Sequence, residues 1–248
     1  EEMGGAAVRL ARAIDYIGAG TIEFLLDEEG RYAFLEMNTR LQVEHGVTEL
    51  VTGLDLVAWQ IRIAQGERLP AAVAEAELRG NAVEVRIYAE DPWNDFRPLG
   101  GTVAAWRPPS GPGVRVDHAV RAGMPLPPEY DPLLAKLMVH AVDRPAMVAR
   151  LRRALDETLV GGVQTDLGFH RWLVDQRAFA SGEYDTDLVP VHWGSGPDVT
   201  PEQARLAAAA AAGARDEQVT QAASPRPAPA AGQHSRWSVA ARQEALRR

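Results

Sequence analysis

Helices are predicted where apolar side chains recur at helical spacing or where a capping residue opens an apolar stretch. These stretches are 6–17, 47–52, 56–65, 146–159 and 167–175. Asp55 and Asp166 stand at N-cap positions, and Pro145 is expected at the first position of its helix. Gly18 and Gly66 follow two of the helices and are expected to end them. The helix at 167–175 is predicted to be the last ordered one.

Strands are predicted where apolar residues run together or alternate with polar ones. The stretches 21–27 and 32–37 are separated by four residues that include Gly30, which predicts a β-hairpin. Further strands are predicted at 81–90, 101–108, 113–120 and 133–142, between turns rich in proline and glycine. Strands and helices that are mixed in this order predict an α+β fold.

Changes in composition divide the chain into three regions. Pro70 and the Ala/Glu-rich run that follows it predict a junction, so we expect folded regions at 1–66 and 67–193. A helix with little apolar face is predicted at 201–215. The Pro/Ala-rich run 221–233 cannot bury enough surface to fold. We therefore expect 194–248 to be a largely disordered linker or tail. Its last residues, "SRWSVAARQEALRR", resemble the start of another element.

Composition excludes several classes of function. The net charge of −8 argues against general binding of nucleic acid or of anionic membranes. The chain has no cysteine and shows neither a signal peptide nor an apolar run of membrane-spanning length, which suits a cytoplasmic protein. Its first residue is not methionine, so a fragment of a longer protein is expected. The one lysine, Lys136, is expected to be a structural strand residue.

Two acidic residues of the predicted hairpin should meet. The hairpin register places Glu23 opposite or diagonal to Glu36, where two carboxylates repel each other. Either both side chains point into solvent or a cation lies between them. Asn38, two residues after Glu36, favours the cation, and ligands that are all oxygen suggest Mg²⁺ or Mn²⁺ bridging to a phosphate.

The residues after Asn38 carry the groups of an anion site. Arg40 offers a planar fork of donors, Gln42 offers an amide, and Glu44 could act as a general base. Each alone is more often a solvated loop residue. An extended strand would spread the alternating residues 36–44 over about 27 Å, so they can share one small site only if the chain turns after about Thr39.

Three segments together resemble a known family. "GAGTIEFLLD", "FLEMNTRLQVEHGVTELVTGLDLVAWQIRIAQGE" and "GNAVEVRIYAEDP" closely resemble biotin carboxylase, most of all the α chain of acyl-CoA carboxylases. The resemblance covers about residues 1–193. It implies the C-terminal part of an ATP-grasp fold followed by a biotin carboxylase C-terminal domain, and it implies carboxylation of carrier-bound biotin with ATP and bicarbonate.

The resemblance also implies roles for individual residues. Those implied to hold the metal ions on ATP are Glu23, Glu36 and Asn38, and those implied to bind bicarbonate are Arg40, Gln42 and the backbone of Val43. Glu44 would be the base that deprotonates bicarbonate, and Arg86 would stabilise the biotin enolate. Leu25 and Leu188 would touch the adenine. The implied partners are a biotinyl carrier domain and a carboxyltransferase subunit.

The chain departs from the family in ways that change these expectations. Gly46 replaces the usual proline after the QVEH motif, which should make the position of Glu44 less rigid. Pro112 replaces an aromatic residue of the bacterial dimer surface, although Arg115 remains, so a bacterial-type homodimer is in doubt and homo-oligomerisation stays open.

The family's glycine-rich phosphate loop and ATP-binding lysines lie upstream of this sequence, so the 248 residues alone are expected to be inactive. One alternative is therefore a non-catalytic module that only assembles with carboxylase partners. Another is a different ATP-grasp ligase, such as a carbamoyl-phosphate synthetase or a purine-pathway carboxylase. That enzyme would not be expected to carry QVEH together with the VEVRIYAEDP strand.

Overall fold

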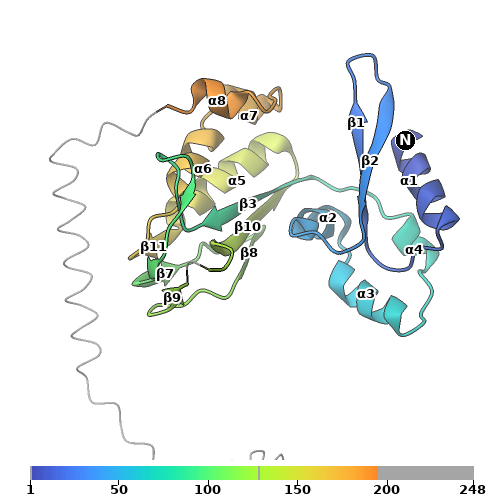
Figure 1. Ribbon diagram of the computed structural model, residues 1–248, viewed down its shortest axis with the longest axis horizontal. Coiled ribbons are helices and arrows are strands. Elements are labelled where there is room, and N and C mark those ends of the chain that lie inside the picture. Colours follow the sequence, from blue (N-terminus) through green and yellow to red (C-terminus); the bar gives the residue numbers. More distant parts are fainter. Residues whose placement is uncertain (1, 128, 195–248) are drawn as a thin grey trace, which may run out of the picture. The chain divides into compact units, whose positions relative to one another are not determined.

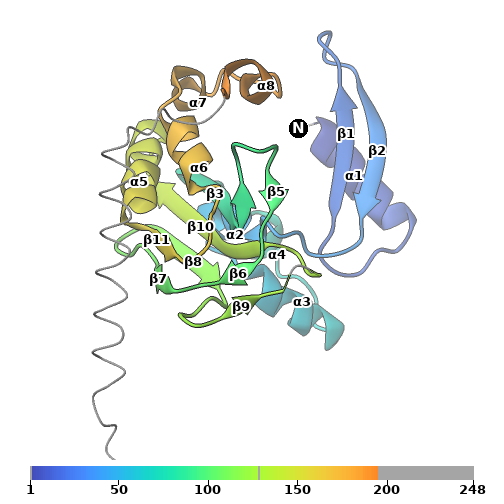
Figure 2. The same cartoon turned by 60° about the vertical axis from the view of Figure 1, so that its left-hand side comes forward.

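The computed structural model describes residues 2–127 and 129–194 (Figure 1). The chain begins with α1 (Glu2–Ala13), β1 (Thr21–Leu26), β2 (Tyr32–Asn38), α2 (His45–Thr52), α3 (Leu56–Ala64) and α4 (Ala71–Ala74). β1 and β2 form the predicted antiparallel hairpin, and α1 lies beside it in both views (Figures 1 and 2). Asp55 caps α3 as predicted, because its side chain accepts a hydrogen bond from the amide of Ala58.

A longer series of elements follows. These are β3 (Asn81–Tyr88), β4 (Glu90–Asp91), β5 (Arg97–Pro98), β6 (Gly101–Thr102), β7 (Ala105–Arg107), β8 (Val114–His118), β9 (Pro125–Leu126), β10 (Leu133–Ala141), α5 (Arg144–Glu157), β11 (Leu159–Gly161), α6 (Leu167–Val174), α7 (Arg177–Ser181) and α8 (Leu188–His192). The main sheet is antiparallel with the order β3-β10-β8. Strand pairs β4-β5, β6-β9 and β7-β11 surround it. The predicted α+β class is confirmed.

Strand register gives the main sheet two different faces. Leu137 of β10 pairs with Val85 of β3 and with Val116 of β8, and these side chains share the apolar face. α5 and α6 cover that face (Figure 2). The neighbouring row of residues points the other way and is charged: Lys136 pairs with Arg86 and with Asp117. The charged face lies against α2.

The apolar core lies entirely in the later part of the chain. Its buried side chains run from Val85 to Phe179 and come mainly from β3, β10, α5 and α6. Of the described residues before Val85, only Gly46 is buried. Four large apolar side chains of the hairpin are more than half exposed or nearly so: Leu25, Leu26, Phe34 and Leu35. The hairpin therefore offers apolar surface that no described residue covers.

Several predicted boundaries differ from the structure. The first helix ends at Ala13, because Asp15 has a positive φ of 49° and breaks it before Gly18. The single strand predicted at 101–108 is divided into β6 and β7, and these pair with different partners. The helix predicted at 146–159 begins at Arg144, and Leu159 instead opens β11.

Two further corrections concern the end of the described chain. Asp166 stands at the N-cap position of α6, but its side chain does not cap the helix; it accepts a hydrogen bond from the Tyr88 amide of β3 at 3.0 Å. The helix at 167–175 is not the last one, since α7 and α8 follow. Each has five residues, too few to show a clear helical period. The predictions for 195–248 lie outside the described residues.

The position of the core predicts where the fold is vulnerable. Leu137 is fully buried on the apolar face, so Leu137→Ala should lower the free energy of unfolding by about 3 kcal/mol, through lost burial and the cavity left behind. Leu78→Ala is the matched control, because Leu78 is 77% exposed and its loss should cost less than about 0.5 kcal/mol. Urea unfolding followed by tryptophan fluorescence measures both changes. Equal losses for the two variants would contradict this location of the core.

Candidate active site

The hairpin brings the two predicted metal carboxylates together. Glu23 pairs directly with Glu36 across the strands, as the register predicted. The amide nitrogen of Asn38 donates to Glu23 Oε1 at 2.8 Å and to Glu36 Oε1 at 3.2 Å. An amide thus bridges the carboxylates and reduces their repulsion. Glu36 is exposed, so the group opens toward solvent on one side.

This group fits a hard divalent cation through the chemistry of its donors. Two carboxylates can bind Mg²⁺ or Mn²⁺, and a turn of the Asn38 amide would present its oxygen in place of its nitrogen. Residues 2–127 and 129–194 contain no cluster of three or more His, Asp or Glu side chains suited to a metal. The remaining ligands would have to come from a bound molecule or from water, which is how Mg²⁺ is commonly held beside phosphates.

The strand ends at Asn38 and the chain bends, as convergence of the site residues required. Residues 39–44 form a loop between β2 and α2. Arg40, Gln42 and Glu44 line one pocket together with His45 and Thr21. Val43 lines a neighbouring pocket with Gln42 and Lys136. The residues predicted to bind an anion therefore gather around one short loop.

Glu44 meets Arg86 across a separation of 42 residues. Glu44 Oε2 accepts a hydrogen bond from Arg86 Nη2 at 2.6 Å, and the two side chains are 48% and 36% exposed. The alternation of residues along the strand, taken without the resemblance, predicts that Arg86 is an exposed strand residue. It is instead half-buried and ion-paired to the predicted base. Loop 39–44 and strand β3 thus contribute to one site.

Behind Arg86 lies a carboxylate that the sequence reasoning missed. Glu84 Oε1 is 3.6 Å from Arg86 Nε, and the Glu84 side chain is only 4% exposed. Neither of its oxygens has a hydrogen-bond partner among residues 2–127 and 129–194. Burial raises the pKa of the Glu84 carboxyl, and the positive charges of Lys136 and Arg86 oppose this increase. The signal was the spacing of Glu84 and Arg86, which puts both on one face of a strand.

The backbone of β3 is also held from the other side. His170 Nε2 lies 2.9 Å from the carbonyl oxygen of Arg86, and Asp166 accepts from the Tyr88 amide. Asp166 and His170 are themselves 3.2 Å apart and almost fully buried. Their i, i+4 spacing on α6 was the available signal. Together they fix the strand on both sides of Ile87, next to the Arg86 side chain.

Gly46 has a packing role in addition to the flexibility predicted for it. It lies in the first turn of α2 and is buried, and a Cβ atom built there would collide with Met138 Sδ of β10. The glycine therefore lets α2 approach the charged face of the sheet closely. The prediction that this glycine loosens the loop left out its packing, because the contact with Met138 is not visible in sequence.

The two residues predicted to contact adenine lie on the described surface. Leu25 is 61% exposed on β1. Leu188 opens α8 and lines a shallow pocket with Tyr184 and Val191. The structure contains nothing that tests a contact with adenine, so both assignments remain predictions.

The chain matches two protein families in succession. Residues 1–72 match the ATP-binding domain of the carbamoyl-phosphate synthase L chain, and residues 84–190 match the biotin carboxylase C-terminal domain. A biotin carboxylase from Nostoc sp. is 51% identical over 189 residues, or 76% of this chain and 42% of that protein. Over these residues the chain is similar to biotin carboxylases. It spans about two fifths of the length of that relative.

Other relatives and solved structures agree on the family. The α subunit of rat mitochondrial methylcrotonoyl-CoA carboxylase is 46% identical over 191 residues, 77% of this chain and 27% of that protein. The biotin carboxylase domain of Hydrogenobacter thermophilus 2-oxoglutarate carboxylase superposes with a TM-score of 0.74 at 42% identity, covering 77% of this chain and 42% of that one. That structure is a dimer in complex with MgADP, ADP and bicarbonate. The predicted fold, an ATP-grasp part followed by the biotin carboxylase C-terminal domain, is confirmed.

The buried Glu84 generates a prediction about pH. Its raised pKa means that the folded chain holds this proton more tightly than the unfolded chain does. Binding of this proton therefore stabilises the folded state fully at acid pH, where Glu84 is protonated. The stabilisation is lost as the pH rises through the folded-state pKa of Glu84. Relative to the wild type, Glu84→Gln should therefore gain stability as the pH rises from the ordinary carboxyl value of 4.5 toward neutrality.

Urea unfolding at several pH values measures this difference. Glu77→Gln is the control, because the Glu77 side chain is 80% exposed. A stability difference between Glu84→Gln and wild type that stays constant with pH would show that Glu84 is not a proton-binding group of this kind.

Proposed function

We propose that this chain provides the bicarbonate and biotin side of a biotin carboxylase, which carboxylates carrier-bound biotin with ATP and bicarbonate. The observation that carries the proposal is the 2.6 Å hydrogen bond between Glu44 and Arg86. A base for bicarbonate and a fixed cation for the biotin enolate must act on neighbouring atoms, because the carboxyl group passes from one substrate to the other. In this chain the two groups touch.

The proposed reaction is the one that the resemblance to biotin carboxylase implies. Arg40, Gln42 and the Val43 amide bind bicarbonate in the loop, and Glu44 removes its proton. The resulting oxyanion attacks the γ-phosphate of ATP and forms carboxyphosphate and ADP. Carboxyphosphate breaks down to CO2 and phosphate, and the phosphate takes the N1′ proton of biotin. Arg86 stabilises the enolate that attacks CO2, a role suited to a guanidinium already held in place.

Glu23, Glu36 and Asn38 would hold Mg²⁺ or Mn²⁺ on the nucleotide. The metal would supply positive charge against the phosphates. The support is the direct pairing of two carboxylates with an amide between them. Leu25 and Leu188 are proposed as the adenine contacts on the resemblance alone.

We further propose that residues 1–66 are the C-terminal part of the ATP-grasp domain and that 67–193 are the biotin carboxylase C-terminal domain. The support is that one family match ends at residue 72 and the next begins at residue 84, both shortly after this boundary. The biotinyl carrier and a carboxyltransferase are the proposed partners, and whether the protein forms a homo-oligomer is left open. No helix in the described part of the chain is both long and apolar enough to cross a membrane.

The base assignment predicts a selective loss of activity. In the full-length protein, Glu44→Gln should lower bicarbonate-dependent ATP cleavage at least about 100-fold, because general-base catalysis contributes factors of this order. The KM for ATP should change little. A phosphate-release assay with and without bicarbonate measures both quantities, and Glu28→Gln in the exposed hairpin turn is the control. An unchanged rate would show that Glu44 is not the base.

The 248 residues taken by themselves should not cleave ATP in response to bicarbonate. They span 42% of the Nostoc relative, and their single lysine already hydrogen-bonds the Val43 carbonyl at 2.8 Å. Only arginine side chains and metal ions would then be left to balance the negative charge of the ATP phosphates. The same phosphate-release assay checks this prediction. Bicarbonate-dependent cleavage by the isolated chain that disappears in Glu44→Gln would contradict it.

A second proposed function is a chain that only assembles with carboxylase partners. Leu25, Leu26, Phe34 and Leu35 offer apolar surface suited to contact with another polypeptide segment. This surface is expected in both cases, as part of an enzyme or as an assembly module. Activity of the full-length protein and its loss in Glu44→Gln separate the two.

A further inference from the structure

Lys136 contacts the loop that carries the proposed bicarbonate site. It lies on β10, on the charged face of the main sheet, and its side chain is 12% exposed. Lys136 Nζ donates a hydrogen bond to the carbonyl oxygen of Val43 at 2.8 Å. Burying an ammonium group is costly unless it is paired, so this contact calls for an explanation beyond packing.

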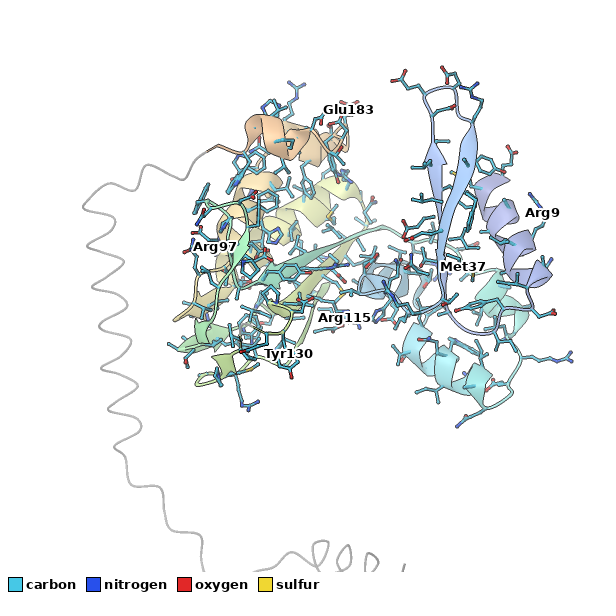
Figure 3. All side chains as sticks on the ribbon, in the orientation of Figure 1. Arg9, Met37, Arg97, Arg115, Tyr130 and Glu183 are labelled. Atoms are coloured by element: carbon cyan, nitrogen blue, oxygen red, sulfur yellow. The ribbon has the colours of Figure 1, made fainter. Side chains whose placement is uncertain are left out.

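The ammonium group is part of a chain of ion pairs. Lys136 Nζ is 3.6 Å from Asp117 Oδ2, and Arg115 holds Asp117 through two hydrogen bonds of 2.9 and 2.8 Å. The hydrogen bonds from Arg115 lower the pKa of Asp117, which keeps it a carboxylate. Arg115 reaches from β8 toward α2, where it binds Glu49 at 2.6 Å (Figure 3). The network thus joins strands β8 and β10 to the helix that follows the loop.

Two held carbonyl groups determine how the loop presents its amides. His45 Nδ1 lies 2.9 Å from the Gln42 oxygen, so Nδ1 is the ring nitrogen that donates a proton there. In a trans peptide the N–H points away from the C=O, and the described residues contain no cis peptide. His45 therefore orients the Val43 amide, and Lys136 orients the amide of Glu44 by holding the Val43 oxygen.

We propose that Lys136 is a positioning residue that fixes the Val43–Glu44 peptide, and so places the base Glu44 beside the bicarbonate that the Val43 amide binds. Lys136 does not contact the reacting atoms itself. Asp117 lies beside its ammonium group, and this compact group suits a single carbonyl acceptor better than a planar guanidinium would. This explains the only lysine in a chain that otherwise uses arginine. The proposal rests on the proposed function for its effect on bicarbonate.

Kinetics of the full-length protein test that effect. Lys136→Met keeps the aliphatic stem and removes the ammonium. We expect kcat/KM for bicarbonate to fall about 10- to 100-fold, as for other residues that orient a site, while KM for ATP stays within about twofold. Lys136→Arg restores a donor and should recover part of the loss. Arg121→Met, in the exposed turn after β8, is the control for removing a cation.

Hydrogen exchange on the 248-residue chain tests the positioning without any activity. Lys136→Met should speed exchange in peptides covering residues 39–44 and leave α5 unchanged. Absence of bicarbonate-dependent cleavage in the wild-type full-length protein would overturn the proposed function, and the exchange result would still decide whether Lys136 fixes the loop.

Three results overturn the positioning role. The first is an unchanged kcat/KM for bicarbonate in Lys136→Met of an active protein. The second is an equal loss for ATP and bicarbonate, and the third is unchanged exchange in 39–44 or equal acceleration there and in α5. An equal loss for ATP and bicarbonate, or equal acceleration of exchange in 39–44 and α5, would indicate general loss of structure.

Discussion

Two-residue alternation across β3, β10 and β8 is the constraint on which the rest of this structure depends. One set of side chains, with Leu137 at its centre, builds the apolar core under α5 and α6. The other set carries Arg86, Lys136 and Asp117 in one row across the sheet. Because side chains of neighbouring residues point to opposite faces, the register that buries the core also presents the charges. A slip of one residue would exchange the two faces.

The charged face is stabilised by the helix and loop that it positions. Isolated charges on a sheet facing a helix would be costly to desolvate, and most of these are paired: Arg115 with Glu49 and Asp117, and Arg86 with Glu44. Glu84 differs, because it is buried and, within the described part of the chain, has no hydrogen-bond partner and only a longer contact with Arg86. Such an unsatisfied group lowers stability, and a cost of this kind is commonly found at functional sites.

Sequence reasoning succeeded where local rules decide the outcome. The turn length sets the hairpin register, so the pairing of Glu23 with Glu36 could be predicted from residue numbers alone. The bend after Thr39 could be predicted because residues 36–44 would lie too far apart in an extended strand to share one small site. The contacts of Lys136 and His170 could not be predicted in this way. Each depends on which elements pack together, and Val43 and Lys136 are 93 residues apart in the chain. Resemblance to biotin carboxylase supplied Arg86, which its strand position alone did not distinguish.

The exchange of proline for Gly46 illustrates why a departure from a family pattern must be interpreted in three dimensions. Taken alone, glycine after the base indicates a looser loop. In the structure, Met138 occupies the space beside Gly46 that a Cβ would need, so the helix can lie closer to the sheet. The closer approach brings Val43 within reach of Lys136 and Glu49 within reach of Arg115. The flexibility that glycine adds to the backbone is therefore opposed by contacts that its small size permits, and these contacts hold the loop on both sides of Glu44.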